Sequence, residues 1–129
     1  MYGFSVNLRG EFDNIITRTT EALKTEGFGV LTEIDVAATL KAKLNVDGRP
    51  YLILGACNPK LAHQALTADP DIGLLLPCNV VVRTEEDGSV TVAFMDPSAV
   101  LSLVDKPGIE RLAGEVRAKL VRVRDALAA

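Results

Sequence analysis

The two cysteines of the chain, Cys57 and Cys78, are the side chains best suited to chemistry. Each lies in or at the end of an apolar run typical of a buried strand, and each is followed by an asparagine, Asn58 or Asn79. Thiols serve as nucleophiles, redox groups and soft metal ligands. If the two strands are neighbours, the sulfurs line one side of a small pocket. We therefore predict a ligand-binding pocket at these four residues.

The two cysteines differ in their expected surroundings. Cys57 ends a predicted strand directly before a predicted helix, where unpaired N–H groups and the helix dipole lower the pKa of a thiol. Cys78 is expected on a core-like strand face, together with Leu74, Leu76, Val80 and Val82. Buried cysteine often acts only as a small apolar side chain, and the spacing matches no zinc or redox signature. Thiol chemistry and simple packing therefore both stay open.

Two further side chains are weaker candidates. Glu33, near the end of an apolar strand, either lines the cleft as an acid or base or faces solvent. His63 is the only histidine, and with Cys57 and Cys78 it would form a three-ligand zinc site with an open position. Its neighbours along the helix are polar, so we expect it at the surface and predict no metal site.

The composition excludes several classes of protein. The 129 residues are 48% hydrophobic and 24% charged, which is typical of one globular domain spanning 1–129. A net charge of −3 with mixed signs argues against nucleic acid as a partner. The N-terminus does not resemble a signal peptide and no apolar run would span a bilayer, so a cytoplasmic location is expected. Phosphate-loop and hydrolase motifs are lacking, and whether the protein is an enzyme stays open.

Hydrophobic periodicity and punctuation residues predict the order βα-β(α)-βα-ββ-α. Gly27 is expected to end the first helix, and Asp35 and Asn58 are expected to cap later helices. Pro77 should hold an edge position or a bulge, because proline donates no ladder hydrogen bond. Strands are predicted at 2–8, 28–34, 51–57, 74–83 and 89–95, and helices at 11–26, 36–44, 59–68 and 107–127, with a helical turn at 98–104. The closing hairpin and long final helix favour an α+β fold, in which helices pack on one face of a mostly antiparallel sheet.

Three segments carry a family resemblance: the stretch from Gly27 to Asp35, Leu54-Gly55-Ala56-Cys57-Asn58-Pro59, and the stretch from Ile72 to Val82 with its Leu-Pro-Cys-Asn core. Together they resemble the bacterial and archaeal "domain of unknown function 302" family over nearly the whole chain. The resemblance implies one two-layer domain with a curved antiparallel sheet, similar to the TATA-binding-protein group. It implies no DNA binding, because a fold does not fix a function.

These observations rank three functions. The first is a binding module for a small ligand or a protein partner, with the cysteines lining its pocket. The second is a thiol-based redox or sulfur-carrier protein that uses Cys57 with Cys78. The third is metal or haem binding through Cys57, Cys78 or His63. No cofactor follows from the sequence, and a homodimer is expected to be feasible because small domains often pair symmetrically.

Overall fold

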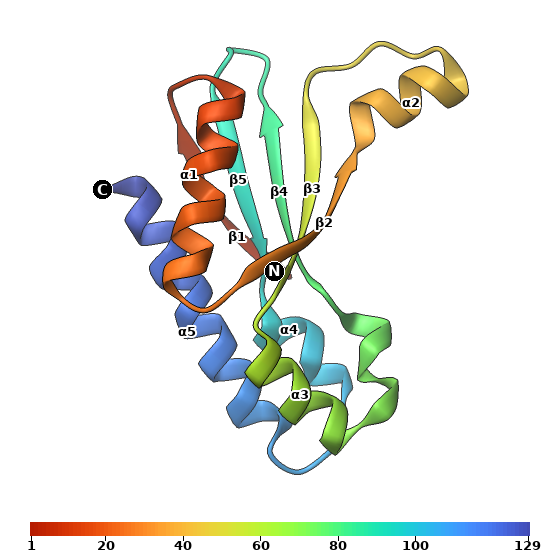
Figure 1. The fold of residues 1–129 in the computed structure, drawn as a ribbon, viewed down its shortest axis with the longest axis vertical. Coiled ribbons are helices and arrows are strands. Elements are labelled where there is room, and N and C mark those ends of the chain that lie inside the picture. Colours follow the sequence, from red (N-terminus) through yellow and green to blue (C-terminus); the bar gives the residue numbers. More distant parts are fainter.

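Five strands form one antiparallel sheet in the order β1-β5-β4-β3-β2 (Figure 1). The computed structural model describes all residues 1–129. The first strand pairs with the last one, so the N-terminal segment is held by the C-terminal half of the chain. The strands are β1 (Gly3–Leu8), β2 (Gly29–Asp35), β3 (Tyr51–Cys57), β4 (Cys78–Thr84) and β5 (Val90–Met95).

One face of the sheet carries the core, because successive strand residues point to opposite sides. Along β4 the side chains of Cys78, Val80 and Val82 are buried, whereas Asn79 between them is exposed. The register continues this face across the sheet, from Leu54 through Val80 and Phe94 to Phe4. The rings of Phe4 and Phe94 stack with centroids 5.6 Å apart.

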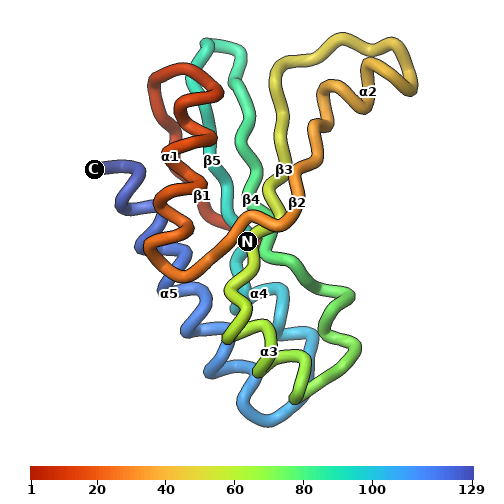
Figure 2. Tube along the Cα trace, viewed as in Figure 1, coloured from red at the N-terminus to blue at the C-terminus, as the bar shows by residue number.

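Two helices cover this face: α1 (Phe12–Thr25) and α5 (Ile109–Ala128). They lie side by side in both views (Figures 1 and 2), and Arg122 on α5 bonds Glu26 at the end of α1 at 2.8 Å. The buried stripe of α5 is Ile109, Leu112, Ala113, Val116, Leu120, Val123 and Leu127. This stripe is the amphipathic pattern predicted for the final helix.

The final helix is longer than the sheet that it covers. Its 20 residues span about 30 Å, whereas the six residues of β5 span about 20 Å. The N-terminal half of α5 therefore extends past the sheet, where α3 (Pro59–Ala68) and α4 (Pro97–Val100) pack against it (Figure 1). Two short 3-10 helices, η1 (Pro70–Leu75) and η2 (Leu101–Leu103), complete this end of the molecule.

Helix α2 (Val36–Leu44) projects away from the body at the far end of β2 (Figures 1 and 2). None of its residues is fully buried. Its ends are specified locally: Asp35 accepts a hydrogen bond from the Ala38 backbone N–H at 2.8 Å, and Asn45 closes it in the left-handed conformation. No helix of the chain is both long enough and apolar enough to cross a membrane.

The predicted α+β fold with an antiparallel sheet and its helices is confirmed, and most boundaries agree within two residues. The predicted strand 74–83 is wrong at its start. Residues 70–75 form η1, begun by Asp69, and β4 starts only at Cys78. Leu74 and Leu76 therefore do not share the strand face of Cys78, and Leu74 is 85% exposed.

Pro77 lies before β4, after a cis peptide bond from Leu76. It occupies neither an edge strand nor a bulge, since β4 is central between β3 and β5. The fixed φ of proline and its missing N–H suit this position before the ladder begins. The predicted packing of helices on one face holds for α1 and α5, whereas α3 and α4 lie beyond the end of the sheet.

Gly55 in the middle of β3 allows its neighbours to come close. A Cβ atom at this position would lie 2.9 Å from Cγ of Pro77 and would collide with the hydroxyl of Thr32 on β2. Both contacts are shorter than side chains tolerate. The absence of a side chain at Gly55 therefore lets β2 and the segment before β4 close over β3.

We expect Gly55→Ala to lower the free energy of unfolding by about 1–3 kcal/mol, because the added methyl group overpacks this site. Urea unfolding measures the change. The matched control is Gly114→Ala, since a Cβ at Gly114 on α5 meets no atom within 4 Å. The control should raise stability by about 0.5–1 kcal/mol through its higher helix propensity. Equal stability of Gly55→Ala and the wild type would contradict the close approach.

Candidate functional site

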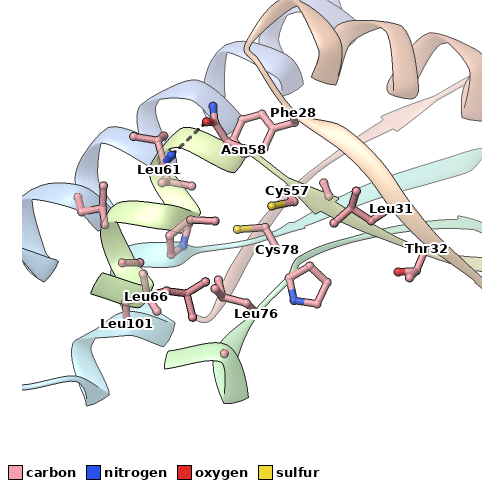
Figure 3. Close-up of a pocket in the computed structure, with 18 residues that line it drawn as sticks. Phe28, Leu31, Thr32, Cys57, Asn58, Leu61, Leu66, Leu76, Cys78 and Leu101 are labelled. Atoms are coloured by element: carbon pink, nitrogen blue, oxygen red, sulfur yellow. Dashed lines mark hydrogen bonds between the residues drawn. The ribbon is translucent and has the colours of Figure 1, made fainter. Parts of the chain in front are cut away.

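A cavity of about 380 Å³ opens where the sheet ends and the second group of helices begins (Figure 3). Its walls come from five separate parts of the chain, within 28–32, 56–66, 73–78, 97–101 and 112–116. The lining residues are Phe28, Leu31, Thr32, Ala56, Cys57, Asn58, Leu61, Ala62, Ala65, Leu66, Gly73, Leu76, Pro77, Cys78, Pro97, Leu101, Leu112 and Val116. The wall is therefore almost entirely apolar.

Helix α3 supplies one wall of the cavity because its inward side carries small residues. Leu61 and Ala65 are buried, and Ala62 is half-buried beside them. Alanine side chains on this face leave room that larger side chains would fill. On the opposite wall, Leu112 and Val116 come from the part of α5 that extends past the sheet.

Asn58 holds the two sides of the site together. Its Oδ1 accepts a hydrogen bond from the Leu61 backbone N–H at 3.3 Å, which caps α3 as predicted. Its Nδ2 donates to the Glu26 carbonyl oxygen at 3.3 Å, at the end of α1. Both ends of the amide are thus used by the protein. Every buried side-chain nitrogen or oxygen atom in the chain has a hydrogen-bond partner.

Both cysteines line this cavity, but they do not form the predicted pair. Cys78 lies opposite Ala56 in the sheet register, and Cys57 lies opposite Gly29. Both thiols are free, and no disulfide joins them. Successive side chains of β3 point to opposite faces of the sheet, so Cys57 points away from the side of Ala56. Because Ala56 is the residue opposite Cys78, the two sulfurs are not directly opposed.

The two thiols differ in exposure, and burial changes the pKa of Cys78. Cys57 is half-exposed directly before the N-cap of α3, where the sequence placed it. Cys78 is buried, and this burial raises the pKa of its thiol from 9.0 to about 11, with a further rise from a charge on Cys57. The Cys78 thiol therefore keeps its proton at neutral pH and is a poor nucleophile.

The remaining predicted site residues lie outside the cavity. Asn79 is exposed on β4 and points to the opposite face of the sheet from Cys78, because it is the next residue along the strand. Glu33 is exposed on the edge strand β2 and does not line the cavity. Of the five predicted ligand-binding residues, Cys57, Asn58 and Cys78 line the cavity, and Asn79 and Glu33 do not.

The three-ligand metal site at Cys57, His63 and Cys78 is not formed. His63 is exposed on α3, one position beyond Ala62, and does not line the cavity. No group of three or more His, Cys, Asp or Glu side chains in the chain is placed to hold a metal ion. The helix orientation separates the histidine from both sulfurs, as its polar neighbours predicted.

Several wall residues could not be recognised from the sequence. Leu101, Leu112 and Val116 belong to apolar patterns that also fill the core, so nothing in the pattern separates a cavity wall from packed interior. The one available signal was the small-residue side of α3, with Ala62 and Ala65 following the Asn58-Pro59 cap.

The raised pKa of Cys78 should appear in the pH dependence of stability. Above about pH 9 the unfolded chain releases the Cys78 proton, while the folded chain keeps it until about pH 11. The free energy of unfolding should therefore fall by about 3 kcal/mol across this window, beyond the loss from other groups. Below pH 9 both the folded and the unfolded chain hold the Cys78 proton, so this group does not lower the free energy of unfolding there.

Urea unfolding of the wild type and of Cys78→Ala, in reducing buffer between about pH 8 and 11, measures this effect. The variant should lack the extra fall, and Cys57→Ala should keep it. Parallel curves for the wild type and Cys78→Ala would show that the folded and unfolded states hold the proton equally.

The comparisons with known proteins agree with this architecture. The chain is similar to the solved structure of an uncharacterised conserved protein from Bacillus stearothermophilus, with a TM-score of 0.89 and 30% sequence identity over 97% of each chain. No curated protein matches the chain. The family model described as "Domain of unknown function DUF302" matches residues 4–127. Because this match covers almost the whole sequence, the chain belongs to the DUF302 family.

Proposed function

We propose that the protein is a binding module for a small, uncharged and mainly apolar molecule. The observation that carries this proposal is the cavity of about 380 Å³ between the sheet end, α3 and α5. Small-molecule sites in proteins typically have volumes of about 300–1,000 Å³ and mostly apolar walls. The cavity therefore has the size and chemistry of a ligand site.

The polar groups of the wall argue for an apolar ligand. Asn58 uses both ends of its amide within the protein, and most of the other wall residues are apolar. A polar ligand would lose hydrogen bonds to water and find few partners in this wall, which costs free energy. An apolar ligand gains about 25 cal/mol for each Å² that it removes from water.

The cysteines support binding better than thiol exchange. Cys78 keeps its proton because burial raises its pKa to about 11, so it is a poor partner in disulfide exchange. Cys57 is half-exposed at the cavity and at the start of α3, and a sulfur-carrier role would rest on it alone. The thiols act in this proposal as polarisable parts of an apolar wall.

Binding of the neutral dye N-phenyl-1-naphthylamine tests the proposal, since its fluorescence rises in apolar surroundings. The chain contains no tryptophan, so the background signal is low. Ala62→Phe should weaken binding at least about tenfold, because the ring occupies the cavity beside α3. The matched control is His63→Phe, which adds the same ring one position further along, outside the cavity.

Three outcomes decide the proposal. Saturable dye binding that Ala62→Phe weakens and His63→Phe leaves intact supports the apolar site. Equal binding by both variants would place the dye elsewhere on the molecule. Loss of binding in Cys57→Ala, which removes only one sulfur from the wall, would favour a thiol-centred role over a shape-selected apolar site.

A further inference from the structure

Seven of the ten exposed large apolar side chains lie in two regions, one toward each end of β2. The first region is the arm, which we define as residues 34–46 and which carries Ile34, Leu40, Leu44 and Val46. The second is the cavity mouth, which we define by the lining residues Leu31 and Leu66 and by Leu74, which follows the lining residue Gly73. Leu44 is 67% exposed and Leu74 is 85% exposed. Clustered exposure of this kind typically marks an interaction surface.

The arm contacts its own chain chiefly at β3. Helix α2 buries none of its nine residues and projects from the body (Figures 1 and 2). Helices this short are marginal in water without packing against an apolar surface. Its caps at Asp35 and Asn45 specify the helix, but its apolar side chains Leu40 and Leu44 remain uncovered.

The accessible surface is large for the mass of the chain. A compact monomer of 13.8 kDa exposes roughly 6,600 Å² by the usual scaling, whereas this chain exposes 7583 Å². The excess is about 1,000 Å². A standard stable interface buries about 800 Å² on each partner. The excess surface is thus enough for one such interface.

A twofold axis beside β2 would make the two regions complementary. β2 is an edge strand, so its outer side is free to face a second chain. The arm follows the C-terminal end of β2, and Leu31 of the cavity mouth lies near the N-terminal end. Rotation by a half turn about the edge brings the arm of one copy to the mouth of the other. Both contacts then form at once, as a closed twofold interface requires.

Helix α2 of the arm and the start of η1 beside the mouth carry opposite charges. Helix α2 carries Lys41 and Lys43 and no acidic residue. Lys41 pairs with Asp47 within the arm, whereas Lys43 makes no ion pair in the chain. Beside Leu74, the start of η1 carries Asp69 and Asp71. Opposite charges at the rim of an interface favour the correct partner and orientation.

We propose that the protein is a twofold homodimer in which the arm of each copy covers the cavity mouth of the other. The partner's arm completes the wall of the site and excludes water from it. The dimer itself stands on the exposed surfaces and charges, and only its role as a cover rests on the proposed function.

Sedimentation velocity on the full-length protein without ligand tests the dimer. The wild type should sediment with about twice the mass of 13.8 kDa. Leu44→Glu should raise the dimer dissociation constant by on the order of 100-fold, because the twofold interface carries the charge twice. The substitution leaves the fold intact, since Leu44 is exposed. The control is Tyr2→Glu, at an 83% exposed apolar residue beside β1, the opposite edge strand of the sheet.

A charge reversal tests the orientation of the two copies. Lys43→Glu should weaken the dimer, and the additional change Asp71→Lys should restore it. Asp71 suits this test because its side chain is exposed and Asp69, not Asp71, caps η1. Failure of the second change to restore the dimer would overturn the assigned contact between arm and mouth.

The other outcomes separate the dimer from the proposed function. A monomeric wild type, or a dimer that Leu44→Glu leaves unchanged, overturns the arm interface. N-phenyl-1-naphthylamine should bind the monomeric Leu44→Glu variant about tenfold more weakly than the dimer. Equal affinity would show that the partner's arm does not cover the cavity mouth. A wild-type dimer that binds no dye overturns the apolar site while the dimer stands.

Discussion

The apolar stripe of α5 is the interaction on which the rest of the structure depends. Its C-terminal half packs beside α1 over the sheet, and its N-terminal half packs against α3 and α4 beyond the sheet. Burial of this stripe is favourable because it removes apolar area from water. Because α5 is longer than the strands, it packs both on the sheet with α1 and on α3 and α4 beyond the sheet. The cavity lies between these two groups of elements, with Val116 of α5 in its wall.

The contacts around β3 hold this opening in place. Gly55 admits Thr32 and Pro77 at close range, and Asn58 ties the end of α1 to the start of α3. The hydrogen bonds of Asn58 use both ends of its amide, and most of the surrounding wall residues are apolar. The chemistry of the two cysteines follows from the same geometry: the buried thiol keeps its proton, and the thiol at the helix start reaches the cavity edge.

Sequence reasoning succeeded where short-range physics decides the structure. Asp35 and Asn58 cap helices because their side chains accept from backbone N–H groups three residues ahead. It failed at 74–83, where an apolar run resembles a strand. In the structure Asp69-Pro70 starts a 3-10 helix, and the strand hydrogen bonds begin only after Pro77. It also expected Asn79 at the pocket, although one alternation step sends this side chain to the other face of the sheet. Exposed Glu33 follows the solvent-facing of its two predicted alternatives.

The sequence by itself determined the α+β class, most helix and strand boundaries, the position of Cys57 before a capped helix, and the resemblance to the DUF302 family. Periodicity, capping and turn residues act over a few positions, so a linear pattern carries them. Only the tertiary structure decided that α5 shares in the cavity wall and that no residue of α2 is buried. These outcomes depend on which apolar faces meet, because burial is non-directional and any apolar stripe can pack against several others.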